Sequence, residues 1–267
     1  MAIAIPGTKK AENIVRQIGD MFAMGLEAMW QALKSIFVTH DFPIAEFLEQ
    51  CWFIAKVTTL PVILISIPFG AVIALQVGSL LAQLGAQSQT GAVMVLAVVR
   101  EQAPVATALL IAGAGGSAMC ADLGARKIRD EIAAMEVMAV NPIARLVAPR
   151  ILAATLVAFL LDAVVSVAGL AGGWFFATQV NHVPSSDFFA SFSALSQLPD
   201  LYIALAKALI FGFLAGMVAC YKGLYCKGGP KGVGDAVNQA VVITFVLLFF
   251  VNFVLTAFYF NFIPQKL

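Results

Sequence analysis

The feature that most constrains the fold is an uncharged apolar run from Ala240 to Phe260, AVVITFVLLFFVNFVLTAFYF. A helix needs about 20 apolar residues to cross the hydrocarbon core of a bilayer. This run is therefore long enough to span a membrane. The composition agrees, because 61% of the residues are hydrophobic and only 12% are charged, which is outside the usual range for a water-soluble domain. We predict an all-α integral membrane protein.

Four further stretches have the length and composition of a spanning helix. They run from about 52 to 81, 91 to 119, 151 to 180 and 201 to 221. The second is the least regular, because Arg100, Glu101 and Pro104 interrupt it. Residues 51–267 are thus predicted to form one five-span domain, and residues 1–50 an N-terminal segment of different character.

The N-terminal segment has the pattern of a helix that lies on the membrane surface. Apolar residues recur at steps of three and four, at Ile14, Ile18, Phe22, Leu26, Met29, Leu33 and Phe37. Charged and amide side chains fill the remaining faces, so the segment is too polar to span. We predict an amphipathic interfacial helix. A helix packed on a soluble partner is the alternative.

The distribution of Lys and Arg predicts the orientation of the spans. Four basic residues precede the first span, five lie in the loop at 121–150, and three lie between the last two spans. The other two connections, at 83–90 and 181–200, contain none. We therefore predict that the N-terminus and both basic loops are cytoplasmic. The C-terminus is predicted to be extracytoplasmic, with Lys266 as an exception.

The loop at 121–150 holds five basic and four acidic side chains in a chain that is poor in charge. Opposite charges recur four residues apart, at Asp122 and Arg126 and at Lys127 and Glu131. Such pairs favour a helix, which we predict from about 127 to 140. Asn141-Pro142 would end it, since the residue before a proline avoids helical angles.

A short charged helix between two spans is the part that a transporter presents to a motor subunit. We predict contact with a soluble partner through Ile128, Glu131, Ile132, Met135, Glu136, Met138, Asn141 and Pro142. A solvated loop that only sets the orientation of the spans explains the charge pattern equally well.

Charged residues at the predicted spans are the second group of candidates. They are Arg100, Glu101, Asp122, Asp162 and Lys207. A charge at the bilayer centre is costly unless it is paired or solvated. An ion pair that only stabilises the fold is the first interpretation, and a role in transport is the second.

Two GxxxG pairs predict close contacts between helices. One is Gly169 with Gly173 in the third span, and the other is Gly212 with Gly216 in the fourth. Tight packing within the chain is the expected result, and a dimer contact is the alternative.

We expect no enzyme activity, cofactor or metal site in this chain. The net charge of +1 provides no basic field for nucleic acid. The four cysteines lack the spacing of a metal site. GAGGSA at 113–118 matches a dinucleotide-binding pattern but sits at a membrane boundary, and GGPKGVGD at 228–235 lacks the ending of a phosphate-binding loop. No ATP site is therefore expected here.

The run from Arg100 to Arg150 resembles the signature of the MlaE/YrbE permease family. The family pattern begins R-E-x-G-P-V-x-T-A-L, continues through A-[DE]-[IL]-G, and ends at a D/N-P pair. The residues on motif positions are Arg100, Glu101, Pro104, Thr107, Gly113, Gly116, Ser117, Asp122, Gly124, Met135 and Pro142. CADLGAR and CYKGLYCKGGPKGVG are most similar to the actinobacterial YrbE branch.

Members of that family are membrane subunits of ABC transporters that move lipids together with Mce-domain proteins. The resemblance implies one interfacial helix and five spans in the cytoplasmic (inner) membrane. It implies a second YrbE-type permease subunit, a cytoplasmic ABC ATPase dimer, and Mce-domain proteins on the outer side. The helix at 127–140 would couple ATP hydrolysis on the partner to movement of a fatty acid, long-chain lipid or sterol.

Two departures from the family pattern remove a charge within a span. Ala114 stands where many members have Arg, and Asn252 stands where many have Asp. They weaken a shared charge relay in this subunit and fit a heterodimer whose second subunit differs. Two other functions stay open: a stand-alone secondary transporter, and a scaffold that anchors an Mce complex without transport. Charge-poor spans and the absence of inverted repeats in the sequence disfavour the former.

Overall fold

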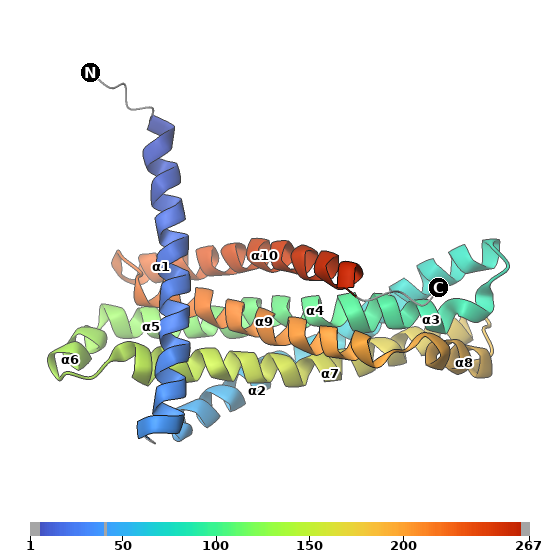
Figure 1. Cartoon of the computed structure of the whole chain (residues 1–267), viewed down its shortest axis with the longest axis horizontal. Coiled ribbons are helices and arrows are strands. Elements are labelled where there is room, and N and C mark those ends of the chain that lie inside the picture. The colour runs from blue at the N-terminus through green and yellow to red at the C-terminus, as the bar shows by residue number, and fades with distance from the viewer. Residues whose placement is uncertain (1–5, 40–41, 263–267) are drawn as a thin grey trace.

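The computed structural model describes residues 6–39 and 42–262, and the regular elements in those ranges are all helices (Figure 1). Five helical segments are long and apolar enough to cross a membrane: Ile44–Gln83, Gln87–Ile128, Ile143–Gln179, Leu198–Leu224 and Gly229–Asn261. The prediction of an all-α membrane protein with five spans is confirmed. Lys266 and residues 1–5 lie outside the described residues, so predictions about them stay untested.

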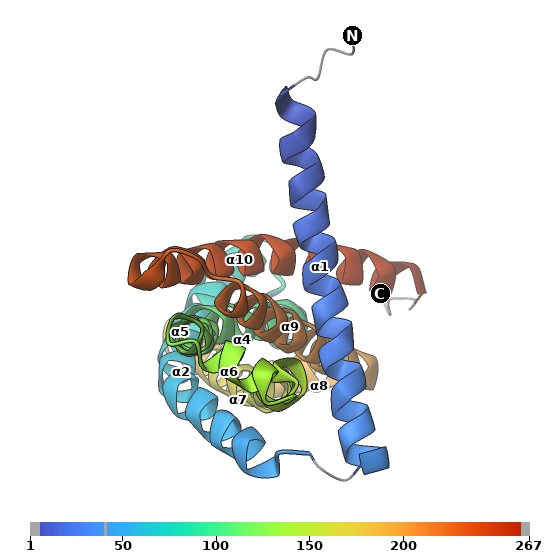
Figure 2. The same ribbon diagram turned by 90° about the vertical axis from the view of Figure 1, so that its left-hand side faces the viewer.

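The N-terminal helix α1 (Pro6–Lys34) ends in a π-helical turn, η1 (Ser35–Thr39). It lies across the bundle of spans and not along it (Figures 1 and 2). Its buried residues are Met21, Met24, Ala28 and Ala32, whereas Leu26 and Trp30 on other faces are exposed. The predicted N-terminal helix is confirmed, and an exposed apolar face is what insertion into a membrane surface requires.

The first two spans are longer than predicted. Helix α2 (Ile44–Gln83) begins eight residues before the expected start at 52. The second span is one continuous helical path made of η2 (Gln87–Gln89), α3 (Thr90–Met94), η3 (Val95–Gln102), α4 (Ala103–Leu110), η4 (Ile111–Gly116) and α5 (Ser117–Ile128). Pro104 lies where η3 joins α4, and the carbonyl of Arg100, four residues earlier, accepts a hydrogen bond from Lys207 Nζ at 3.3 Å. The polar interruption therefore does not end the span.

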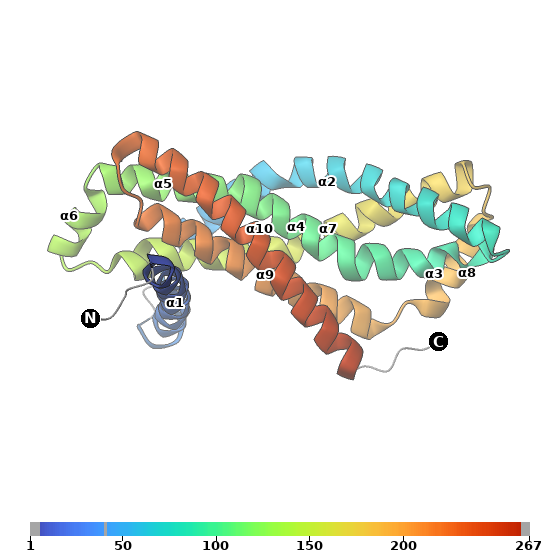
Figure 3. The same cartoon turned by 90° about the horizontal axis from the view of Figure 1, so that it is seen from above.

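The rest of the chain completes the bundle. It comprises α6 (Glu131–Val137), η5 (Ile143–Val147), α7 (Ala148–Gln179), α8 (Ser185–Leu195), α9 (Leu198–Leu224) and α10 (Gly229–Phe262). Helix α6 lies at one end of the bundle with α1 and α5, and α3 and α8 lie at the other end (Figures 1 and 3).

Close backbone contacts hold α2, α7 and α9 together. A Cβ atom on Gly70 of α2 would collide with the carbonyl oxygen of Gly169 in α7. A Cβ atom on Gly212 of α9 would lie 2.9 Å from the carbonyl oxygen of Ala154 in α7. Small residues matter in lipid because van der Waals packing, and not apolar burial, drives helices together. The GxxxG pairs thus serve packing within the chain, as predicted.

Helix α10 contributes least to the core. Only 11% of its most apolar window is buried, against 67% for α9. It crosses the bundle obliquely, over α4 and α9 (Figure 3). Phe249, Phe250 and Phe253 on its surface are more than half exposed. One side of the bundle is therefore tightly packed, and the α10 side is open.

We expect Gly172→Ala in α7 to lower the thermal unfolding temperature. Its new methyl group would collide with the carbonyl oxygen of Ile67 in α2, and overpacking costs about 1–3 kcal/mol. Gly234→Ala in α10 is the matched control, because a Cβ atom there meets nothing within 4 Å. Tryptophan fluorescence in detergent follows the unfolding. Equal unfolding curves for the two variants would contradict a tight crossing of α2 and α7.

Candidate functional site

A cluster of paired charges lies inside the bundle, where the second, fourth and fifth spans meet. Lys207 of α9 is fully buried, and its Nζ donates to Glu101 Oε2 at 2.9 Å and to Thr256 Oγ1 of α10 at 2.8 Å. Asn252 Nδ2, also on α10, donates to the same Glu101 oxygen at 3.4 Å. A buried ion pair needs such additional hydrogen bonds to offset the loss of water. Lys207 is therefore held inside the bundle and does not extend to the interface.

Arg100 of η3 extends this cluster to Asp200 of α9 and to two aromatic rings of α10. Its Nη1 lies 3.5 Å from Asp200 Oδ1 on α9, and its Nε lies 3.9 Å from Glu101 Oε1. The guanidinium stacks over the rings of Tyr259 and Phe260 at 5.1 and 4.9 Å from the centroids. The hydroxyl of Tyr259 donates to Asp200 Oδ1 at 2.7 Å. Two cations thus meet two carboxylates, so the cluster is neutral.

The structure brings Arg100, Glu101 and Lys207 together as ion pairs. Asp162 lies on α7, is buried, and interacts electrostatically with Lys207. Its Oδ1 has no hydrogen-bond partner within the described ranges. Asp200 was not among the predicted residues, because it lies just before the fourth apolar stretch. Thr256 was not among them, because the candidates were charged residues within the spans.

An apolar groove opens beside the charge cluster. It consists of two adjoining pockets of about 300 and 430 Å³ that share Ala106 and Leu109. Its walls are Ile65 and Phe69 of α2, Val105 and Leu109 of α4, and Phe245 and Asn252 of α10. We call this space the α2–α10 groove. Polar side chains gather at one end only, where Glu101, Gln102 and Asn252 line it, and Ala114 lines the apolar end.

The predicted helix at 127–140 is wrong in its extent. Helix α5 ends at Ile128, and Asp130 takes a left-handed conformation with φ of 57°. Helix α6 then spans only Glu131–Val137, and Ala139 is again left-handed, with φ of 58°. Asp tolerates this conformation because its short polar side chain bonds locally. The chain must reverse direction between α5 and α7, which outweighs the weak helical preference of the charge pairs.

The charge pairs of the loop are only partly those expected. Asp122 and Arg126 pair at 3.3 Å, as their spacing predicts. Glu131 pairs with Arg129 at 2.7 Å, two residues away, in place of the expected partner four residues away. The second pair closes the turn at Asp130 and does not support a continuous helix.

The candidate contact residues of the loop differ in accessibility. Ile128, Glu136, Met138 and Asn141 are exposed, Glu131, Met135 and Pro142 are partly buried, and Ile132 is buried. Ile132 packs into the main hydrophobic core. Asn141 Oδ1 accepts the backbone N–H of Ile143 at 2.9 Å, so it caps the next helical turn. Val137, which the sequence did not single out, is 89% exposed.

Arg150 joins the loop to the first span. It is fully buried at the start of α7, and its Nη2 lies 2.6 Å from Asp122 Oδ2 and 3.3 Å from Glu46 Oε1. One cation thus ties α2, α5 and α7 together. Asp122 belongs to this network and not to the Lys207 cluster. In the sequence Arg150 counted only toward the predicted orientation of the spans. Its ion pairs could not be predicted, because the partners are 28 and 104 residues away.

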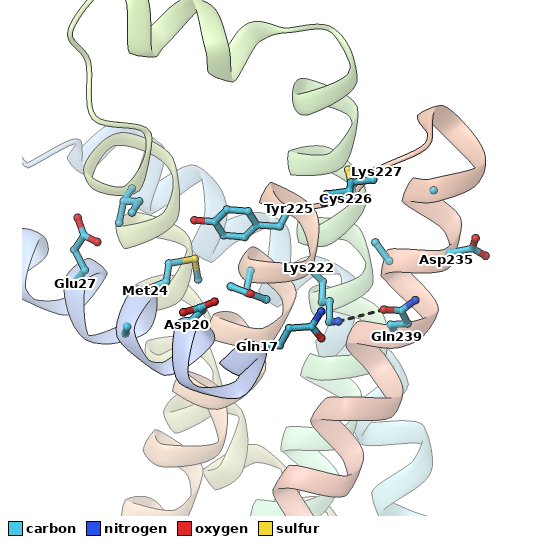
Figure 4. Close-up of a pocket in the computed structure, with 15 residues that line it drawn as sticks. Gln17, Asp20, Met24, Glu27, Lys222, Tyr225, Cys226, Lys227, Asp235 and Gln239 are labelled. Atoms are coloured by element: carbon cyan, nitrogen blue, oxygen red, sulfur yellow. Dashed lines mark hydrogen bonds between the residues drawn. The ribbon is translucent and has the colours of Figure 1, made fainter. Parts of the chain in front are cut away.

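A polar pocket of about 740 Å³ lies at the α6 end of the bundle (Figure 4). Gln17, Asp20 and Glu27 of α1 line one side of it. On the other side Lys222 of α9 donates to Gln239 Oε1 of α10 at 3.1 Å. Its mixture of acids, bases and amides suits water or a soluble partner and not a lipid chain.

We expect Arg150→Ala to destabilise the protein by about 1.5–3 kcal/mol, the contribution of hydrogen bonds to charged groups, because it removes the buried cation that Asp122 and Glu46 share. Arg129→Ala is the matched control. It breaks an exposed ion pair in the same loop, which contributes at most about 1 kcal/mol. Thermal unfolding in detergent compares the two variants. A loss no greater for Arg150 than for Arg129 would show that the three-helix junction does not depend on Arg150.

Comparisons with known proteins agree with this architecture. The family model described as Permease MlaE matches residues 47–258, from the start of α2 almost to the end of α10. A probable ABC transporter permease protein of Synechocystis sp. is 34% identical over 187 residues, 70% of this chain and 71% of that protein. A probable ABC transporter permease protein of Rickettsia typhi is 32% identical over 199 residues, 74% and 77% of the two chains. The chloroplast protein TRIGALACTOSYLDIACYLGLYCEROL 1 of Arabidopsis thaliana is 31% identical over 179 residues, 67% and 51% of the two chains. The chain therefore belongs to the MlaE permease family of ABC transporters and is a multi-pass membrane protein.

Proposed function

We propose that this chain is the permease subunit of an Mce-type ABC transporter that moves a hydrophobic lipid across the cell envelope. The α2–α10 groove carries this proposal. It lies within the spans, its walls are apolar, and its polar groups are confined to one end. A lipid has the same division between an apolar body and a polar end. The name of the Arabidopsis relative, which refers to a galactosylated diacylglycerol, supports a lipid substrate.

Membership of an ABC transporter permease family implies an ATPase partner, and α6 offers the surface to receive it. Val137 and Met138 project apolar side chains outside the bundle. On the same short helix Ile132 packs into the core. A push on the exposed face would therefore be transmitted to the packed face. Arg150 then links the loop to Glu46 at the start of α2, and α2 forms one wall of the groove.

The open side of the bundle supports a second permease subunit. The α2–α10 groove adjoins the exposed face of α10, since Phe245 and Asn252 of α10 line the groove. A second YrbE-type subunit placed against α10 would close the groove from the membrane. A distinct paralogue, as in the actinobacterial branch, would supply the charges that Ala114 and Asn252 lack.

The basic loops support an orientation with α1 and α6 in the cytoplasm and α3 and α8 outside the cytoplasmic membrane. Mce-domain proteins would then meet the α3 and α8 end, and the C-terminus would be extracytoplasmic. The polar pocket of Figure 4 would lie on the cytoplasmic side, beside the ATPase.

We expect Met138→Glu to lower lipid-stimulated ATP hydrolysis by about tenfold or more in the assembled complex. A charge forced into an apolar contact loses at least about 1.4 kcal/mol, which equals that factor. Met138→Leu keeps an apolar side chain of similar size at the same position and is the matched control, for which we expect near-normal hydrolysis. ATP hydrolysis and lipid transfer are measured in nanodiscs. Normal transfer by Met138→Glu in an intact complex would favour a scaffold.

We expect a cysteine at Ser185 to react with a membrane-impermeant maleimide in intact cells. A cysteine at Ala139 should react only after the cells are permeabilised. Both positions are exposed in this chain, so in cells that produce it without its partners the membrane and not burial decides their reactivity. The four native cysteines are first replaced by alanine. The opposite labelling pattern would place the α6 end outside the cell and exclude contact with a cytoplasmic ATPase.

A further inference from the structure

The polar end of the α2–α10 groove presents a carboxylate and amides, with its cations hidden behind them. The Glu101 side chain is 35% exposed, whereas Lys207 and Arg100 are buried. Lys207 does not line the groove as described, although it neutralises Glu101 from the side of α9. A ligand in the groove therefore meets one carboxylate and two amides, and the charge among these lining groups is negative.

Two amides at this end have hydrogen-bonding capacity to spare. Gln102 is 8% exposed, and neither its Oε1 nor its Nε2 has a partner among the described residues. Asn252 donates to Glu101 through Nδ2, but its Oδ1 has no partner in the same ranges. Leaving a buried polar atom unpaired costs about 1–3 kcal/mol. A ligand that satisfies these atoms recovers part of that cost.

The amide of Gln102 lies between α7 and the groove. Its Oε1 and Nε2 are buried beside Gly169 of α7, where a Cβ atom would make ordinary van der Waals contact with them at 3.5 and 3.6 Å. Gln102 also lines the groove next to Glu101. Binding of a ligand through this amide therefore requires a change of side-chain rotamer, from α7 toward the groove.

We propose that the polar end of the groove binds the hydroxyl group of an uncharged lipid. This inference rests on the proposed lipid transport and names the substrate class. The hydroxyl donates to the exposed edge of Glu101 and accepts from Gln102 Nε2, while the apolar body lies along Val105, Leu109 and Phe245. A hydroxyl is the smallest group that both donates and accepts. Sterols and long-chain alcohols share this chemistry.

The same geometry disfavours two other classes of lipid. A phosphate or carboxylate head group would approach Glu101 with like charge, and like-charge contacts in a desolvated site cost several kcal/mol. A plain hydrocarbon would fill the groove but would offer no hydrogen bond to the exposed edge of Glu101 or to the amide of Gln102. A site that hydrogen-bonds its substrate strongly rejects an analogue that lacks the polar group. An apolar pocket, which discriminates only by size, rejects a wrong substrate less strongly.

The test uses the complete transporter in nanodiscs and measures binding of tritiated cholesterol and tritiated stearyl alcohol. Stearic acid, octadecane, cholesterol sulfate and phosphatidylglycerol are the competitors, so that charge is varied on matched apolar bodies. We expect both hydroxyl lipids or one of them to bind, and all four competitors to displace them at least about tenfold less well than the unlabelled alcohol, a difference of about 1.4 kcal/mol.

Gln102→Leu is the diagnostic variant. It should lose about tenfold in affinity for the hydroxyl lipid while octadecane binding stays the same or improves. It should also raise the unfolding temperature, because it removes an unpaired buried amide. Thr107→Val is the matched control: its hydroxyl is also buried without a partner in the described residues, on the next turn of the same span, but it does not line the groove. Gln102→Asn should restore part of the affinity.

Three results would overturn the inference. Stronger binding of stearic acid, cholesterol sulfate or phosphatidylglycerol than of the hydroxyl lipids would show an anionic substrate, and would leave the lipid permease proposal standing. Equal affinities for Gln102→Leu and Thr107→Val would remove Gln102 from the site. Absence of binding by every lipid in an assembled, ATP-hydrolysing complex would count against lipid transport itself.

Discussion

The ion pair between Lys207 and Glu101 determines how the second, fourth and fifth spans meet. A single charge at that depth in hydrocarbon is costly, so each charged side chain requires a partner from another helix. Thr256 and Asn252 of α10 complete the hydrogen bonds of the pair. Helix α10 also packs into the main core through apolar residues such as Ala236, Ala240 and Leu248. The polar contacts therefore position its C-terminal half, where they hold α10 beside the polar end of the groove.

Glycine contacts act on the other side of the bundle. At Gly70 and Gly169 the backbones of α2 and α7 touch, and in lipid such closeness provides much of the attraction between helices. The bundle thus has one face joined by backbone packing and another joined by buried polar groups. Arg150 lies at the end of the packed face and connects it to the loop that carries α6. Displacement of that loop would accordingly move α2 and α7 as one unit relative to α10.

The sequence predicted the spans well because the thickness of the hydrocarbon acts on each apolar stretch separately. It predicted the helix at 127–140 badly, since helical charge pairs are weak and the reversal at Asp130 is imposed by the helices on either side. Arg150 and Glu46 could not be paired from local patterns, as they are far apart in the chain. Likewise, Gln102 carries no charge and belongs to no periodic pattern, so nothing in the sequence singled it out. That its amide is buried without a partner follows only from how α7 and α10 pack around it.

Asn252 shows how one departure from the family pattern changes the chemistry of the groove. An aspartate at this position would set a second carboxylate against Glu101 with Lys207 as their shared cation, leaving one negative charge in excess. Asparagine donates to Glu101 at 3.4 Å and adds no charge, so Glu101 does not compete with a second acid at this position for Lys207. The Oδ1 of Asn252 is buried and has no hydrogen-bond partner among the described residues. Loss of the acid thus makes the polar end less negative and richer in amide groups, which is the environment that an uncharged hydroxyl requires and an ionic head group does not.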